Sequence, residues 1–297
     1  MTTTSDVPTR ADLRAQLTAS RIAGAVATPR QDNLDHYERM SRREPLYLLG
    51  LRPERAWTAA EVLALMAVRC GVSPDPSHTS GQDTIDPDRT IERLEAMAER
   101  LRSAAVRRER VLVATGHPVG LRPVHTAIAR ALGTAGCTLL APAAGWAHPS
   151  GSEYDTAPGS ISYADGVAVI ARPTGALLHT HSPLPMVAAL ADLVAGGESA
   201  PDLVVADHGW TGAAGQAGVD AVGFADSNDP ALFVGEAEGR VLVCVPLDDN
   251  VDPRLYAPLT RYLIARAGLS HEPDCGRGPA DTPDNRGKAE FGSGKRT

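Results

Sequence analysis

The stretch VLVATGHPVGLRPVHTAIARAL, residues 111–132, decides the fold of this chain. It begins with the apolar run VLVA and ends in an amphipathic segment. Between them, Gly116-His117-Pro118-Val119-Gly120 leaves room only for a tight turn. A strand that is apolar throughout is buried on both faces, as in a parallel sheet. The stretch therefore predicts a buried strand, a turn that carries a histidine, and a helix over residues 121–135.

The alternation of strand and helix continues from residue 109 to residue 248. Further strands are expected at CTLLAPA, DLVVAD, DAVGFAD and GRVLVCVP, and SISYADGVAVIARPTGALLHTH reads as short strands joined by turns. Apolar strands that alternate with helices imply parallel pairing with right-handed crossovers. We therefore predict an α/β fold: a mostly parallel, Rossmann-like sheet with helices on both faces.

The first hundred residues are expected to be almost purely helical, with ADLRAQLTASRIAG as the first helix. Thr58 and Glu61 form a capping box ahead of a helix that Gly71 ends, and Pro87 lies in the first turn of another. The segment after Leu269 is rich in Gly, Pro and charge, so we expect it to stay disordered. The predicted organisation is a disordered N-terminus over 1–9, a helical segment over 10–108 that packs on the core, an α/β core with the site over 109–269, and a disordered tail over 270–297.

The composition predicts a globular protein of the cytoplasm. The chain has 297 residues, of which 43% are hydrophobic and 22% are charged, and its formal net charge is −7. This acidic balance argues against sequence-independent nucleic-acid binding, which needs a basic face. No apolar run approaches the roughly 20 residues of a membrane span, and the N-terminus lacks a signal-peptide core. The four cysteines form no CxxC pair, as expected in a reducing compartment.

Histidines, carboxylates and an asparagine follow five of the predicted strands. In an open α/β sheet, ligands bind beyond the carboxyl ends of the strands. We therefore expect these segments to share one polar edge of the sheet. The five segments are Thr115-Gly116-His117-Pro118, His179-Thr180-His181-Ser182-Pro183, Asp207-His208-Gly209-Trp210, Asp226-Ser227-Asn228-Asp229-Pro230 and Asp248-Asp249-Asn250.

The oxygen-bearing side chains of these segments suit a divalent metal. Mg²⁺ prefers hard oxygen ligands, and nearby histidines shift the preference toward Mn, Fe, Ni or Zn. We expect Mg or Mn. Taken singly, Asp229 could instead cap the helix that follows it. The predicted metal ligands or supports are Asp207, Asp226, Asn228 and Asp229.

Four histidines are the candidate catalytic residues. His179 and His181 are two residues apart, so on a strand they would point the same way. Together with His117 and His208, they could polarise phosphate oxygens or donate a proton. A structural histidine in the core is the alternative for each.

Substrate contacts are expected in two further places. Gly116 and Gly120 would let backbone N–H groups approach a phosphate at the start of the next helix. The GQDTIDP loop could bring Gln82, Asp83 and Asp86 to the substrate. Neither GxGxxG nor a Walker A sequence occurs, which weakens the case for nucleotide binding. The absence of a GxSxG motif argues against an α/β-hydrolase.

Several long motifs resemble a family of actinobacterial proteins called phosphatases. The motifs are RIAGAVATPRQDNLDHY, GQDTIDP, ATGHPVGL, LLHTHSPLPM, DLVVADHGWTGAAGQAGVDAVGFADSNDPAL and VPLDDN. The resemblance covers roughly residues 10 to 269 and implies hydrolysis of a phosphate ester. It carries no list of catalytic residues, so the site residues named above come from the strand ends alone.

The predicted function is metal-dependent hydrolysis of a small phosphorylated metabolite, with no nucleic-acid or membrane partner and no prediction of oligomeric state. Two alternatives stay open. One is a protein that binds a phosphometabolite or nucleotide without turnover, and the other is an isomerase or lyase that uses His/Asp acid–base pairs. Convergence of the five segments within metal-coordination distance would favour an enzyme. Carboxylates that cap helices and face away would favour binding or no site.

Overall fold

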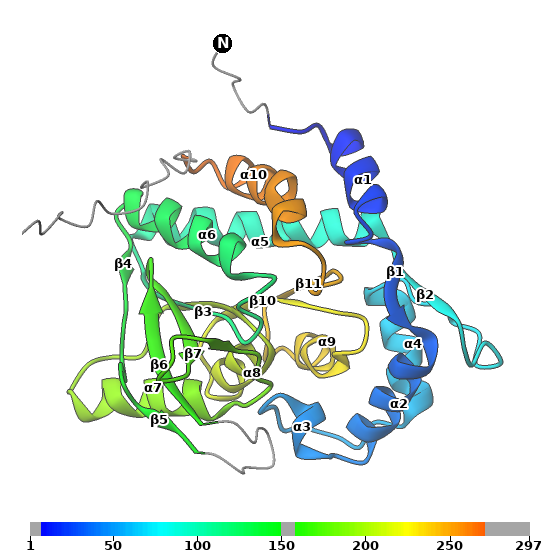
Figure 1. Ribbon diagram of the computed structural model, residues 1–297, viewed down its shortest axis with the longest axis horizontal. Coiled ribbons are helices and arrows are strands. Elements are labelled where there is room, and N and C mark those ends of the chain that lie inside the picture. The colour runs from blue at the N-terminus through cyan, green and yellow to red at the C-terminus, as the bar shows by residue number, and fades with distance from the viewer. Residues whose placement is uncertain (1–6, 150–157, 271–297) are drawn as a thin grey trace, which may run out of the picture.

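The structure is a computed structural model that describes residues 7–149 and 158–270. It is an α/β fold around a mixed sheet with the strand order β11-β10-β9-β3-β7-β6-β5 (Figure 1). One half of the sheet is parallel and contains β3 (Arg110–Ala114), β9 (Leu203–Asp207), β10 (Ala221–Ala225) and β11 (Val243–Pro246). The other half is antiparallel and contains β5 (Ala147–His148), β6 (Gly159–Ala164), β7 (Val167–Ala171) and β8 (Leu177–Leu178).

Two short contacts complete the sheet at β3. The two-residue strand β4 (Thr138–Leu139) pairs parallel with the start of β3, and β7 pairs parallel with its end. The predicted α/β class with a mostly parallel sheet is therefore confirmed, with an antiparallel extension on one side.

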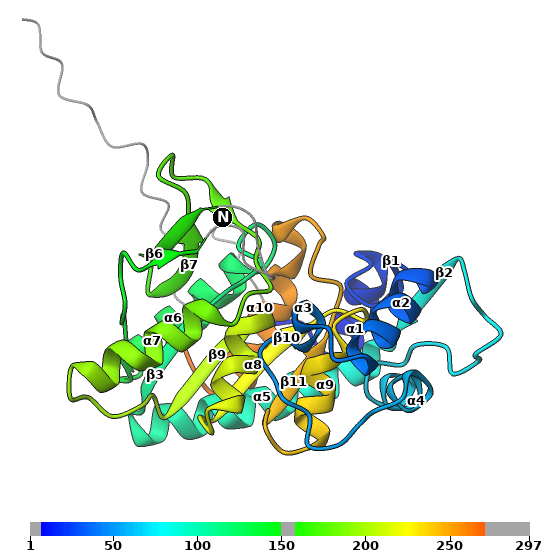
Figure 2. The same ribbon diagram turned by 90° about the horizontal axis from the view of Figure 1, so that it is seen from below.

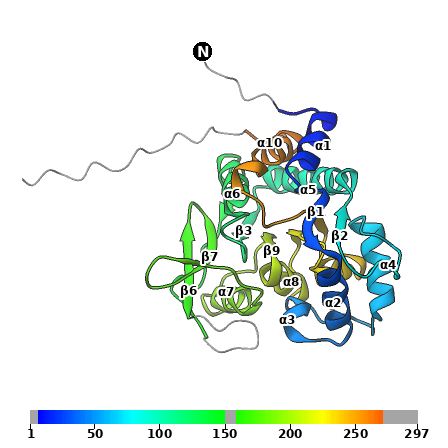
Figure 3. The same ribbon diagram turned by 45° about the vertical axis from the view of Figure 1, so that its right-hand side comes forward.

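Helices cover both faces of the sheet, because neighbouring residues of its apolar strands face opposite ways. On β3, Val111 and Val113 enter one core, whereas Leu112 and Ala114 enter the other. Figure 3 shows one layer above the sheet and another below it. The first layer contains α5 (Pro87–Arg107), α6 (Arg122–Thr134) and α10 (Ala257–Arg266), which follows the 3-10 turn η1 (Pro253–Tyr256). The second contains α7 (Leu184–Ala195), α8 (His208–Gln216) and α9 (Pro230–Ala237).

The N-terminal segment packs beside the β11 edge of the sheet, opposite β6 and β7 (Figure 2). Its helices are α1 (Arg10–Ala19), α2 (Arg30–Ser41), α3 (Pro45–Leu48) and α4 (Ala59–Arg69). The local signals were read correctly at three positions: Thr58 and Glu61 form the capping box of α4, and Pro87 is the first residue of α5.

The predicted N-terminal helical segment is confirmed, but it is interrupted by two short strands. β1 (Gly24–Pro29) and β2 (Gln82–Ile85) form an antiparallel ribbon between the helices. The first helix stops at Ala19, because the chain turns through left-handed conformations at Arg21 (φ 61°) and Gly24 (φ 79°). GQDTIDP was expected as a loop, but its middle is strand β2, whose side chains are alternately exposed and buried.

The ends of the chain limit what can be compared with the predicted organisation. Thr9, placed in the disordered N-terminus, instead caps α1 through a capping box with Asp12. The predicted disordered tail lies outside the described residues from position 271 onward. Within the described ranges, no helix combines the length and apolarity needed to cross a bilayer.

Candidate active site

The five polar segments meet at one edge of the sheet, where they line a pocket of about 340 Å³. The parallel strands β3, β9, β10 and β11 bring four of the segments there directly, because their carboxyl ends share an edge. The N-terminal segment supplies the rest of the wall. The lining side chains are those of Ala27, Thr28, Pro29, Asp32, His117, His179, His181, His208, Asp226, Asn228, Asp229, Asp248, Asp249 and Asn250.

His179 and His181 reach this edge by a different route. They follow β8, which is antiparallel to β7, so the rule about carboxyl ends does not place them. β7 pairs with the end of β3 and runs on beyond it, and β8 then returns toward the edge. The backbone N–H of Thr180 donates to the carbonyl of Gly116 at 2.9 Å, which fixes the returning loop against the β3 turn.

The two glycines of the β3 turn serve close packing, and the predicted phosphate cradle is not formed. A Cβ on Gly116 would lie 2.4 Å from the carbonyl oxygen of Thr180, and one on Gly120 would lie 2.2 Å from that of Asp249. The N–H of Gly116 donates to Asp207 at 2.6 Å, so it is not available to a phosphate. Neither glycine lines the pocket.

Asp207 lies behind the pocket and supports His208. Its carboxylate accepts bonds from the Thr115 hydroxyl at 2.5 Å and from Nδ1 of His208 at 2.8 Å, besides those from the turn. Burial acts to raise the pKa of Asp207, but the hydrogen bond and charge of His208 bring it well below its usual range. Asp207, predicted as a metal ligand or support, is placed as a support, because its oxygens are already occupied and do not line the pocket.

His208 presents its remaining ring nitrogen, Nε2, to two carboxylates. Nε2 lies 3.4 Å from Asp229 and 3.5 Å from Asp249. Burial acts to lower the pKa of His208, but Asp229 and Asp207 raise it to about 10. The side chain of Asp229 makes no capping bond to α9, so it faces His208 rather than the helix that follows it.

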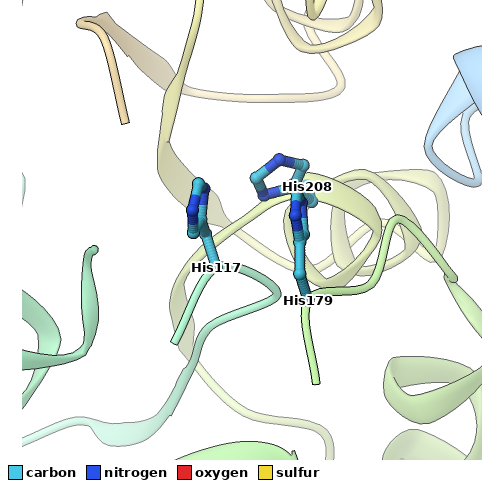
Figure 4. Close-up of side chains that lie close together, drawn as sticks. All are labelled: His117, His179 and His208. Carbon is cyan, nitrogen blue, oxygen red and sulfur yellow. The ribbon is translucent and has the colours of Figure 1, made fainter. Parts of the chain in front are cut away.

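The histidine rings form a compact cluster drawn from three loops (Figure 4). The rings of His117 and His179 stack with centroids 4.4 Å apart, and those of His179 and His208 lie 5.1 Å apart. The ring of His181 is 4.6 Å from that of His208. Burial, together with the charge of neighbouring histidines, lowers the pKa of His179 to about 4 and also lowers that of His181. These two imidazoles are therefore neutral at pH 7.

A carboxylate cluster lies beside the histidines. Asp226 accepts bonds from the hydroxyl of Thr28 and the N–H of Ser227, both at 2.5 Å. Burial and the charges of Asp249 and Asp248 raise the pKa of Asp226 well above its usual value. One oxygen of Asp249 lies 3.1 Å from Nδ1 of His117. The pKa of Asp249 is lowered because contacts with His117 and His208 outweigh its burial.

The structure places two predicted substrate contacts, Asp83 and Asp86, away from the site. The predicted metal ligand Asn228 lies in it. Asp83 is buried in the N-terminal segment against Arg30, and Asp86 caps α5. Both predictions are wrong about position, because GQDTIDP is fixed as a strand away from the pocket. Asn228 does line the pocket, and its carbonyl contacts Nδ1 of His36 at 2.7 Å.

Seven pocket residues were not among the predicted site residues: Ala27, Thr28, Pro29, Asp32, Asp248, Asp249 and Asn250. Asp248 and Asp249 follow a predicted strand, and the same rule that selected Asp226 would have selected them. Thr28 and Asp32 carry no local signal. They reach the pocket because the N–H of Ala27 donates to Asp248, a contact between residues 221 positions apart.

The chemistry of these side chains fits a divalent metal. Three groups each offer ligand atoms within 4.8 Å of one another: His117, His179 and His208; His181, His208 and Asp229; and Asp226, Asp248 and Asp249. In the described part of the chain, the buried Oδ2 of Asp249 accepts no hydrogen bond. Nε2 of His208 lies 3.5 Å from this oxygen, which is longer than a good hydrogen bond, so a cation could complete its coordination. Imidazole nitrogens and carboxylate oxygens together are ligands that Mn²⁺ and similar ions accept.

Comparisons with known proteins agree on one family. The sequence model of a family described as Phosphatase matches residues 8–271. A curated protein of Streptomyces coelicolor named Phosphatase SCO2771 is 50% identical over 264 residues, which is 88% of this chain and 97% of that protein. The range matched by the family model spans every position that lines the pocket.

Proposed function

The chain belongs to the Phosphatase family, and from this premise we propose that it is a metal-dependent phosphatase that hydrolyses the monoester of a small phosphorylated metabolite. The observation that carries the proposal is the convergence of histidines and carboxylates from five separate segments on one pocket. A merely binding protein has no need of so many titratable groups at mutual ligand distance. Perturbed groups collected in a cleft are typical of catalytic sites.

In this proposal, the inner residues of the pocket bind metal and the phosphoryl group, and the outer residues contact the rest of the substrate. Inside, the histidine and carboxylate clusters would hold metal and face the phosphoryl group. A bound divalent cation supplies positive charge for the phosphoryl oxygens and lowers the pKa of water. Asp207 fixes the tautomer and orientation of His208, as a carboxylate behind a metal-binding histidine does.

Hydrolysis forms a bond from a water oxygen to phosphorus and breaks the bond from phosphorus to the ester oxygen, which must gain a proton. His181 lines the pocket beside His208, and its neutral imidazole can relay that proton. The rest of the substrate meets the polar rim formed by Thr28, Asp32, Asn228 and Asn250. A volume of about 340 Å³ is at the small end of ligand sites, in keeping with a small metabolite.

A phosphate-release screen over a panel of phosphorylated metabolites tests this function. We expect release with at least one ester after Mg²⁺ or Mn²⁺ is added, and loss of release in EDTA that either ion restores. Release that persists in EDTA would contradict metal dependence. Tight binding of an ester without release would favour the binding protein, and conversion without free phosphate would favour an isomerase or lyase.

A further inference from the structure

Histidine is the cationic residue type that the described lining of the pocket offers to a phosphate. Among the described residues that line it there is neither lysine nor arginine, whereas five are aspartates: Asp32, Asp226, Asp229, Asp248 and Asp249. A phosphate ester carries up to two negative charges, and like charges at contact distance repel strongly inside a protein. The carboxylates outnumber the cationic groups of this lining, so binding of a phosphate ester calls for added positive charge.

The histidine side of the pocket offers ligands for one cation. Nδ1 of His208 is taken by Asp207 at 2.8 Å, so only Nε2 can bind metal. The two histidine-containing groups both include His208. Because a ring nitrogen has one lone pair, these groups are alternative sets around a single cation rather than two positions.

The carboxylate side offers a second, separate position. Asp226, Asp248 and Asp249 share no member with the histidine groups. Asp226 and Asp248 are each oriented by the N-terminal wall of the pocket, through the hydroxyl of Thr28 and the N–H of Ala27 at 3.1 Å. Such bonds hold the carboxylates close together in spite of their charges.

Asp249 lies between the two positions. One of its oxygens lies 3.1 Å from His117 and the other 3.5 Å from His208, although the residue also belongs to the carboxylate group. Its side chain is only 8% exposed, and Oδ2 accepts no hydrogen bond within the described residues. A carboxylate can bind two cations through its two oxygens, which would satisfy both sides at once.

We propose that the pocket binds two divalent cations at unlike positions, one held by His117, His179 and His208 and the other by Asp226, Asp248 and Asp249, with Asp249 contacting both. The proposal deepens the proposed metal-dependent hydrolysis and rests on it for the nature of the reaction. The imidazole-rich position favours a transition ion such as Mn²⁺ or Zn²⁺. The carboxylate position also accepts Mg²⁺.

Metal stoichiometry tests the number of positions independently of activity. The full-length chain is stripped with chelator and dialysed against Mn²⁺, and bound manganese per chain is measured by elemental analysis and electron paramagnetic resonance. We expect two Mn²⁺ per chain, with a spin-coupled spectrum. Asp248→Asn and His179→Ala should each bind one, with the spectrum of an isolated ion. Asp252→Asn makes the same change as Asp248→Asn on an exposed residue outside the pocket, and it should bind two.

The outcomes separate this proposal from the proposed function. A wild-type chain that binds one Mn²⁺ at saturation, or an Asp248→Asn variant that binds two, overturns the two-cation site. Loss of both ions in either variant overturns the claim that the positions are separate. If Asp248→Asn fails to fold by circular dichroism, Asp226→Asn replaces it with the same expectation. If the chain binds one cation and hydrolyses an ester, the proposed phosphatase function holds and the two-cation site does not. If it binds two cations and hydrolyses no ester, the two-cation site holds and the proposed function does not.

Discussion

Two buried groups of charged residues in this protein differ in one respect: whether their polar atoms have partners. In the N-terminal segment, the Asp83 carboxylate accepts bonds from Arg30 and Asn33, both at 2.9 Å, and from the N–H groups of Ser73 and Thr84. The Arg30 guanidinium also donates to two backbone carbonyls. This group neutralises its own charge and satisfies its own bonds.

The carboxylate cluster of the pocket does neither. Asp226, Asp248 and Asp249 gather like charges, and one oxygen of Asp249 accepts no bond in the described structure. Buried polar groups in native proteins are normally satisfied, so an unsatisfied group needs another explanation. Burial and charge therefore do not by themselves identify a functional site. An unpaired oxygen within a group of like charges that lines a pocket is a stronger sign, because a ligand can complete its coordination.

The largest expected difference between the two groups comes from Asp249→Asn. Removing this charge should lower turnover about 10³-fold, equivalent to about 4 kcal/mol, as expected when a group that supports transition-state charge is lost. The free energy of unfolding of the metal-free chain should change by less than about 1 kcal/mol, since the lost contacts with His117 and His208 are offset by relief of repulsion from the neighbouring carboxylates. Steady-state kinetics and urea unfolding measure both. A folded variant with normal turnover would remove Asp249 from the mechanism.

The same chemical change in the other group should have the opposite outcome. Asp83→Asn leaves the fully buried Arg30 without its carboxylate, and breaking a buried ion pair costs about 3 kcal/mol or more. The free energy of unfolding should fall by that amount, while turnover per folded molecule stays within about threefold. Urea titration followed by an activity assay of the folded fraction provides the test. A stable variant with poor turnover would mean that GQDTIDP contributes to the site after all.

Substitution of His179 or His181 tests whether the histidines of the pocket, like its carboxylates, affect turnover more than stability. His179→Ala and His181→Ala should each lower turnover about 10²-fold, or about 2.7 kcal/mol, because contacts to growing charge are lost. Stability should change little, since both rings lie at the pocket surface. Turnover and thermal unfolding are measured on both variants. Unstable proteins with normal activity per folded molecule would assign these histidines to the core.

The smallest expected effect concerns a support of the carboxylate cluster. Thr28→Val removes one hydrogen bond to Asp226, worth about 1 kcal/mol, and should lower turnover about fivefold by loosening that carboxylate. Thr84→Val, in the partner strand, is the control, because its hydroxyl donates to the Gly71 carbonyl instead. Equal turnover in the two variants would show that Thr28 does not position Asp226.

The sheet and its polar edge could be predicted because their signals are local. Apolar runs identified β3, β9, β10 and β11, and the residues that follow those strands include most of the pocket. Roles within the pocket could not be predicted in the same way. Asp207 and Asp226 have the same place in the sequence pattern, each at or after a buried strand. Only the surrounding donors show that Asp207 supports a histidine.

The errors have one physical origin, which is pairing over long distances in sequence. Asp83 is a carboxylate in a polar motif, which made it a candidate site residue. Its partner Arg30 is 53 positions away, and no periodicity in the sequence predicts that pair. Gly116 was predicted to approach a phosphate, but its N–H donates to Asp207, which is 91 positions away. Local patterns cannot reveal such partners, because they depend on which segments the finished fold brings together.

The contact between Ala27 and Asp248, 221 positions apart, has a consequence for the newly made chain. A ribosome releases Thr28 long before the segment after β11, since chains emerge from the N-terminus. Until the segment after β11 emerges, Ala27 has no Asp248 to contact. The pocket then lacks the carboxylates of Asp248 and Asp249. A nascent chain therefore lacks a complete pocket until the segment after β11 has emerged, and activity that depends on this pocket can begin only then.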